Sequence, residues 1–150
     1  MSKKNGHAEP FIILPRSLLF SKAWQSMSIH TRRLLDFLMV EHMRHGGRKN
    51  GFLVAPRDQL NLWGIGKHFV SGAIEDAEYV GLIDRTRSKG RAPSRYALTW
   101  LPLADGTAPS NRWQHSDQKA MEVFALRKLA KTRLSEADFQ PAKVNSLRCP

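Results

Sequence analysis

Apolar residues recur at helical spacing in the first part of the chain. One run of this pattern begins after Ser28, whose short polar side chain suits an N-cap, and is stopped by Gly46-Gly47. A second, shorter run follows Pro56, a residue that suits the first turn of a helix. The pattern therefore predicts a long helix over 28–45 and a helix of two turns over 57–63.

A third helical run follows the Gly-rich segment 64–66. Val70, Ile74 and Ala77 lie at i, i+4 and i+7, which predicts a helix over 67–80 with one buried face. Gly81 suits the position just after its end. We expect the two earlier helices to bury their own apolar side chains in the same core: Leu34, Leu35, Leu38, Met39, Leu60 and Trp63.

Strand-like segments come next. The segments 82–86 and 95–101 flank a loop with turn residues such as Lys89-Gly90, which predicts a β-hairpin. A minimal strand over 52–54 is expected after the turn signal Asn50-Gly51. The predicted fold class is mainly α with a small β-hairpin and a C-terminal helix.

These elements divide the chain into five predicted parts. The middle part is one domain of ordinary size, and the last helix has a good N-cap candidate in Ser116. In chain order we expect a flexible N-terminal arm over 1–10, the domain over 11–103, a linker over 104–115, a helical extension over 116–140 and a flexible tail over 141–150.

The charge of the chain indicates its partner. The sequence has 24 Lys and Arg against 13 Asp and Glu, a net charge of +11, which favours binding to polyanions. The eleven residues 85–95 contain five of these cations and no acid. We therefore expect nucleic acid as the partner, with a solvated basic hairpin as the alternative.

Other chemistry is not visible in the sequence. The single cysteine, Cys149, allows no disulfide within the chain. His42 and His45 lie at i and i+3 without further ligands, so we expect surface histidines and no metal site. No phosphate-binding loop or nucleophile motif is present, so we expect no catalytic residue, no cofactor and no enzyme activity. The chain has no apolar run near the roughly 20 residues of a membrane span, and its polar start has no signal-peptide core, so we expect a cytoplasmic protein without a membrane partner.

Several positions between 50 and 98 follow a known pattern: Asn50-Gly51-Phe52-Leu53-Val54, Leu60, Gly64, Val70, Ala73-Ile74, Gly81-Leu82-Ile83 and Tyr96-Ala97-Leu98. This pattern resembles the winged helix-turn-helix of DNA-binding proteins of bacterial mobile elements, which include phage and plasmid regulators and replication initiators. The segment 11–28 resembles the lead-in of some of these proteins. The resemblance implies the fold but not the biological role, because repressors, initiators and recombination accessory proteins share it.

The exposed side of the helix over 67–80 is expected to meet the bases. Three acids, Glu75, Asp76 and Glu78, lie in its second half and would repel phosphates, so we expect the helix to enter the major groove by its N-terminal end. A glycine on that side would let the helix approach the duplex closely. The predicted base contacts are Lys67, His68, Ser71 and Gly72.

The basic residues are expected to contact the phosphates. Side chains alternate along a strand, so Arg85 and Arg87 are expected on one face of the hairpin, with Lys89 and Arg91 beside its tip. Cations near the helix starts are weaker candidates. The predicted backbone contacts are Arg85, Arg87, Lys89, Arg91, Arg95, Arg57, Arg32 and Arg33.

The sequence thus predicts sequence-specific binding of double-stranded DNA by a repressor-like transcriptional regulator of a phage, plasmid or integrated element. Two alternatives remain open. One is a replication-initiation or replisome-organising protein, and the other is a winged-helix module that binds another protein. We expect the C-terminal helix to pair with a second copy in a homodimer, although its apolar side could pack on its own domain and its cations could follow the DNA. We expect no small-molecule ligand.

Overall fold

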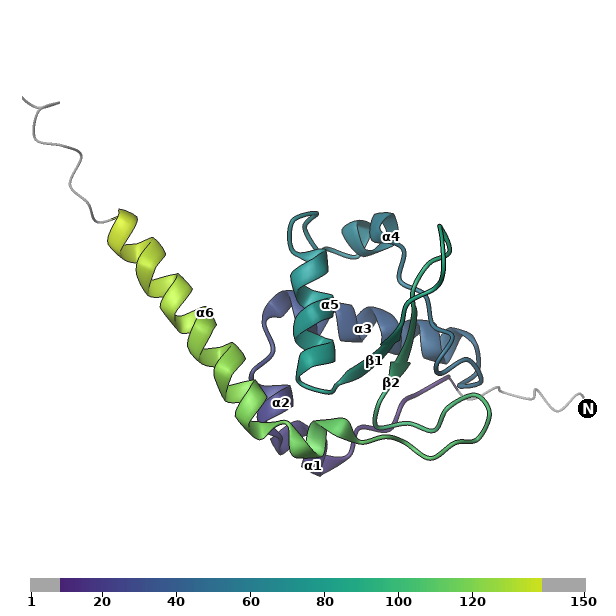
Figure 1. The fold of residues 1–150 in the computed structure, drawn as a ribbon. Coiled ribbons are helices and arrows are strands. Elements are labelled where there is room, and N and C mark those ends of the chain that lie inside the picture. The colour runs from purple at the N-terminus through teal and green to yellow at the C-terminus, as the bar shows by residue number, and fades with distance from the viewer. Residues whose placement is uncertain (1–8, 139–150) are drawn as a thin grey trace, which may run out of the picture.

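The computed structural model describes residues 9–138, with side chains as far as residue 130. Most of the predicted N-terminal arm, the predicted tail over 141–150 and Cys149 lie outside this range. Within it the chain is mainly helical with a small antiparallel sheet, as the sequence predicts (Figure 1). None of the helices in this range is both long enough and apolar enough to cross a membrane.

Three helices form the N-terminal part: α1 (Arg16–Phe20), α2 (Lys22–Gln25) and α3 (Ile29–Arg44). The cap predicted for α3 is present, because the Thr31 N–H donates to Ser28 Oγ at 3.2 Å. The helix ends at Arg44, and Gly46-Gly47 follow it with φ angles of 62° and 73°, which are in the left-handed region. The prediction of a long helix over 28–45 is therefore confirmed to within one residue at each end.

Two shorter helices follow, α4 (Arg57–Leu62) and α5 (Val70–Tyr79). The prediction that the second of them begins at Lys67 is wrong. The Phe69 N–H donates to the Gly66 carbonyl at 2.8 Å and closes a turn, and no side chain caps the helix that follows. The first α-helical bond joins the Ala73 N–H to the Phe69 carbonyl at 3.0 Å. Lys67 and His68 consequently lie in the turn before α5.

Gly81 ends α5 as predicted. Its φ is +81°, and the Leu82 N–H donates to the Ala77 carbonyl at 2.9 Å, which is the bond that closes a Schellman motif. A Cβ atom at Gly81 would lie 2.8 Å from the backbone of Arg112 and of Trp113. This position therefore requires glycine for its backbone angle and also for the close approach of another segment.

The hairpin consists of β1 (Ile83–Thr86) and β2 (Arg95–Leu98), with Ile83 opposite Leu98. The second strand is three residues shorter than predicted, because Thr99 leaves the sheet and donates its hydroxyl to the Gly81 carbonyl at 2.7 Å. The strand predicted over 52–54 is reduced to one bridge between Leu53 and Tyr96.

Asn50 belongs to the predicted turn at 50–51 and is also fully buried. Its Nδ2 donates to the carbonyls of Leu98, Leu101 and Pro102 at 3.0, 3.2 and 3.0 Å. Its Oδ1 accepts the Leu98 N–H at 2.7 Å. One side chain thus holds the end of β2 and the loop that follows it.

The core lies between α3, α5 and the hairpin. It buries most of the predicted side chains, including Leu34, Leu35, Leu38 and Leu60. Trp63 is an exception and was predicted wrongly: it is 43% exposed and meets the ring of Phe37 edge-on at a centroid distance of 5.8 Å. It lies at the end of α4, where the chain turns away towards Gly64.

The segment 104–115, predicted as a linker, lies against the domain. It holds a short 3-10 helix, η1 (Arg112–His115), whose Trp113 is buried. Arg112 bridges to Asp84 and also donates to the Ile83 carbonyl at 2.8 Å. The last helix, α6 (Asp117–Asp138), packs its first turns on α2 and then extends away from the body (Figure 1). Ser116 precedes it as predicted, and its hydroxyl donates to the Arg112 carbonyl at 2.8 Å.

Candidate nucleic-acid interface

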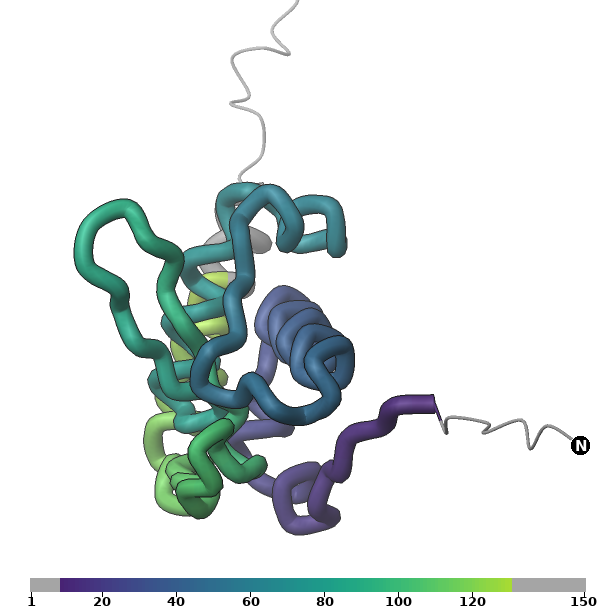
Figure 2. Tube along the Cα trace, turned by 90° about the vertical axis from the view of Figure 1, so that its right-hand side faces the viewer, coloured from purple at the N-terminus to yellow at the C-terminus, as the bar shows by residue number. Residues whose placement is uncertain are grey.

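One end of the molecule collects the segments that the sequence predicts to bind DNA. The hairpin loop (residues 87–94), α4 and the turn over 64–69 that leads into α5 all lie at the top of Figures 1 and 2, two views at right angles. The N-terminus of α5 is at the same end, and its C-terminus runs back towards the body. A partner that approaches this end meets the start of α5 and the hairpin loop together.

The predicted base-contact residues are all exposed at the start of α5: Lys67, His68, Ser71 and Gly72. Gly72 has open space where a Cβ would lie, with no atom within 4 Å. Glycine in a helix costs about 1 kcal/mol relative to alanine, and neither packing nor a positive φ requires it here. Gly72 therefore leaves the surface of the first turn of α5 open.

Arg57 connects α4 to this segment. Its Nη2 donates to Ser71 Oγ at 2.8 Å across the exposed surface. Arg57, which was predicted to contact DNA phosphates, is therefore bonded directly to Ser71, which was predicted to contact a base. This bond holds the Ser71 hydroxyl as an acceptor, so that its own proton remains available to a partner.

Part of the acidic second half of α5 makes contacts within the protein, while Glu75 is exposed. Glu78 accepts a bond from Arg85 Nε at 2.9 Å, and the Tyr79 hydroxyl donates to Glu122 of α6 at 2.7 Å. Burial raises the pKa of the Asp76 carboxyl, while the nearby Arg127 guanidinium acts in the opposite direction. This half of α5 therefore contacts the hairpin through Glu78 and α6 through Tyr79.

Arg85 is therefore a correction to the predicted backbone contacts. Its side chain is only 15% exposed, because β1 places it against the end of α5 where Glu78 neutralises it. Arg87 follows the last residue of β1, Thr86, and is exposed in the hairpin loop. Arg85 therefore ties the hairpin to the end of α5.

The exposed cations of the hairpin loop are Arg87, Lys89 and Arg91. A bond from Ser88 Oγ to the Pro93 carbonyl at 2.8 Å braces the base of the loop. Arg95 begins β2 and places its guanidinium 5.3 Å from the centroid of the Phe52 ring, so part of its surface is used within the protein. The hairpin loop (residues 87–94) thus exposes three cations and contains no acidic residue.

The two arginines at the start of α3 have different surroundings. Arg33 Nη1 donates to the Gly64 carbonyl at 2.6 Å, which fixes the turn between α4 and α5. Arg32 bridges to Asp36 at 3.4 Å and lies over the Trp24 ring. Arg33 thus fixes the turn between α4 and α5, a role that the sequence did not indicate. Arg32 instead contacts Asp36 of α3 and the Trp24 ring of α2.

Sequence reasoning missed Phe69. Its ring is 52% exposed and stacks on His30 with a centroid distance of 4.0 Å and an interplanar angle of 6°. The residue lies between the predicted base contacts Lys67-His68 and the first turn of α5. The available signal was an aromatic residue that fits neither the buried stripe nor the polar face of the predicted helix.

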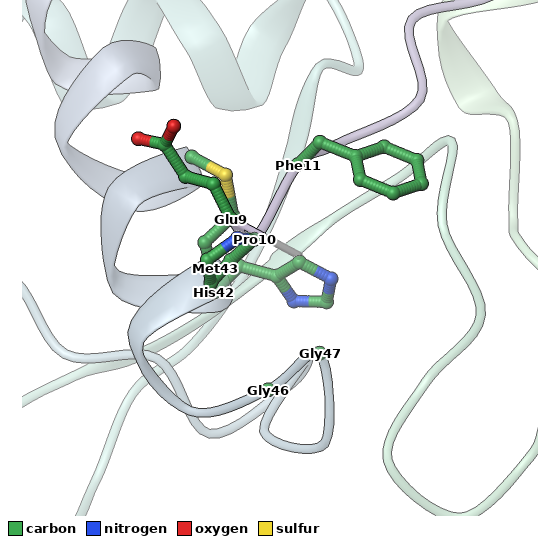
Figure 3. Close-up of a pocket in the computed structure, with 7 residues that line it drawn as sticks. All are labelled: Glu9, Pro10, Phe11, His42, Met43, Gly46 and Gly47. Carbon is green, nitrogen blue, oxygen red and sulfur yellow. The ribbon is translucent and has the colours of Figure 1, made fainter. Parts of the chain in front are cut away.

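A separate cavity of about 280 Å³ lies at the C-terminal end of α3 (Figure 3). His42 and Phe11 line it together with Gly47. The expectation of a surface histidine is wrong for His42, which is 8% exposed, and burial lowers the pKa of its imidazole. Its Nδ1 has no hydrogen-bond partner in the described part of the chain. The full length of α3 separates this cavity from the start of α5.

Neither a metal site nor a known relative gives a further indication of function. The described residues contain no group of three or more His, Cys, Asp or Glu side chains that could hold a metal ion. No family model, curated protein or solved structure matches this chain. The fold is that of a mainly helical protein with a basic hairpin, an arrangement consistent with a winged helix.

Proposed function

We propose that this protein binds double-stranded DNA sequence-specifically through a winged helix-turn-helix. In this proposal α4, the turn over 64–69 and α5 form the helix-turn-helix, and β1, the hairpin loop and β2 form the wing. The observation that carries it is the position of Gly72, an open glycine at the same end of the molecule as three exposed loop cations. The loop supplies phosphate contacts, and the start of α5 reaches the bases.

The start of α5 is suited to an anionic partner. The N-cap residue of this helix, Phe69, makes no capping bond with its side chain, so within the described residues the first backbone N–H groups, those of Val70, Ser71 and Gly72, lack the acceptor that such a cap would provide. A DNA phosphate would satisfy them and would also interact favourably with the helix dipole. Phosphate binding and base reading are therefore compatible at one helix end.

The biological role we propose is that of a repressor-like regulator of a phage, plasmid or integrated element, which occupies a promoter. Its proposed base-reading set is Lys67, His68 and Ser71, which together offer several hydrogen-bond donors to the base edges. The rival role, replication initiation, has the support of the resemblance in segment 11–28 and predicts repeated target sequences near an origin.

Selection of bound duplexes from a random DNA library tests the function directly. We expect the protein to enrich one short recurring sequence, because its base-reading segment is short and rigidly placed. Mapping that sequence in the source genome separates a promoter target from an origin target. Failure to enrich any duplex, together with salt-insensitive binding, would reject the proposal.

The variant Gly72→Ala sharpens this test because its two effects have opposite signs. Alanine should raise the free energy of unfolding by up to about 1 kcal/mol, since the added methyl meets no atom of the protein. The same methyl should lower affinity for the selected duplex, by about tenfold or more, if the helix and DNA are in close contact. Thermal melts and titrations measure the two effects, and unchanged affinity would contradict close approach at this position.

We also propose that two copies pair through α6. Four large apolar side chains on this helix are half or more exposed: Met121, Phe124, Leu126 and Leu129. At about 100 Å² each they offer roughly 400 Å² per copy, about half of what one partner buries in a stable interface. Met121 and Phe124 also line a cavity of about 330 Å³ between α2 and α6. In a two-fold pair the leucines of each copy can fill the cavity of the other.

The oligomeric state in solution tests this pairing. We expect light scattering to report twice the monomer mass for the wild-type protein, and the monomer mass for Leu126→Glu/Leu129→Glu, because glutamates would be buried at the contact. The matched control is Ile13→Glu/Val40→Glu, which places the same charges at exposed apolar positions outside α6. A wild-type monomer at tens of micromolar, or a dimeric α6 variant, would contradict the proposal.

A further inference from the structure

We infer that Phe69 is a specificity-determining residue that reads the methyl group of a thymine in the major groove. This inference rests on the proposed DNA-binding function and adds an apolar contact to the polar base contacts at Lys67, His68 and Ser71. Phe69 is the last residue before α5, in the turn at the end of the molecule that the hairpin loop shares (Figures 1 and 2).

The ring of Phe69 is held in one orientation. One face stacks on His30 of α3, nearly parallel and 4.0 Å away between centroids. Gly66 makes room for it, because a Cβ there would lie 3.1 Å from the ring, closer than most such contacts. The backbone bond from Phe69 to the Gly66 carbonyl fixes the turn itself. With one face stacked on His30, the residue still leaves 52% of its surface in solvent.

The core does not require this ring. Val70 and Ala73, the neighbouring residues that pack α5 against α3, are almost fully buried, whereas Phe69 leaves about half of its surface in solvent. A phenylalanine that is rigid and yet exposed is suited to a contact with something outside the chain. Its neighbours in sequence are the exposed Lys67 and His68, and the open Gly72 lies less than one turn further along.

The chemistry of the ring selects the group it can recognise. A phenyl ring offers no ordinary hydrogen-bond donor or acceptor, so it cannot distinguish the polar patterns of the base edges. The one apolar group on those edges in the major groove is the C5-methyl of thymine. Burial of one methyl group corresponds to a factor of about four in affinity. Phe69 therefore favours thymine at one position of the target.

Replacement of thymine by deoxyuridine isolates this contact, because it removes the methyl and leaves base pairing unchanged. Using the duplex obtained by library selection, each thymine is replaced in turn and affinity is measured for the wild type and for Phe69→Ala and Phe69→Leu. For the wild type we expect a loss of about fourfold at one position. For Phe69→Ala we expect no further loss at that position, and for Phe69→Leu an intermediate loss.

The matched control is Phe11→Ala, which removes an exposed phenylalanine beside the cavity at the other end of α3 and should keep the fourfold penalty. Melting curves verify that each variant is folded. Tight duplex binding with no penalty at any thymine, or an equal penalty in Phe69→Ala, overturns the role of Phe69 and leaves the proposed function standing. Absence of duplex binding by the wild type overturns both.

Discussion

Replacing Arg87, Lys89 and Arg91 by alanine is expected to weaken binding to every DNA duplex, selected or random, on the order of a hundredfold at moderate salt. These three side chains are the exposed cations of the hairpin loop, which has no acid to neutralise them. Phosphates carry no sequence information, so the loss should be uniform across sequences. The slope of log affinity against log salt concentration should become shallower by about 2.7, because each phosphate contact contributes about 0.9.

The control for this prediction must remove the same charge elsewhere. The triple variant with alanine at Lys22, Arg48 and Lys49 does so, since all three are exposed cations outside the hairpin loop and α5. It should change the salt slope much less than the loop variant. Titrations at several salt concentrations measure both proteins. Equal slopes for the two variants would mean that the loop is not a specific phosphate contact.

Replacing Asn50 by alanine is expected to destabilise the fold by about 3 kcal/mol or more. The change removes four hydrogen bonds at a fully buried position and leaves the Leu98 N–H without its acceptor. A domain of this size is stable by about 5–15 kcal/mol in total, so the loss is a large share of it. The melting temperature should fall by about 10 °C or more, as measured by circular dichroism.

Asn61→Ala is the matched control, because Asn61 is an exposed asparagine on α4. Its melting temperature should stay within a few degrees of the wild type, since surface substitutions usually change stability by about 0.5 kcal/mol or less. A small effect at Asn50 would show that water or a backbone shift replaces its bonds.

Local signals were sufficient for the elements whose boundaries are set by neighbouring residues. Ser28 and Gly46-Gly47 fix both ends of α3 within a few residues, and Gly81 ends α5 by its backbone angle. The start of α5 was predicted three residues too early, because helical periodicity cannot distinguish a first turn of helix from the turn closed at Gly66. Asn50 shows a second limit of local signals. The sequence indicated only a turn at this residue, but its side chain also bonds to residues about fifty positions away.

The residue types of the candidate site could be predicted from the sequence, but the contacts between its side chains could not. The basic loop and the polar start of the helix could be identified from charge and periodicity. The pairing of Arg85 with Glu78 could not, because it depends on how β1 lies against α5. The same holds for Arg33 at the Gly64 carbonyl and for the stacking of Phe69 on His30, which join helices distant in sequence.

The close contact at Gly81 has a geometric consequence for a pair of copies. Arg112 bonds to the carbonyls of Glu78 and Ile83, and the backbone of η1 presses against Gly81, so the base of α6 is joined to the end of α5 without a flexible connection. If two copies pair through α6 and bind DNA as proposed, the distance between their two α5 helices is then fixed by the protein. We expect such a dimer to require one spacing between two half-sites, and a target with altered spacing would have to bend or twist to be bound.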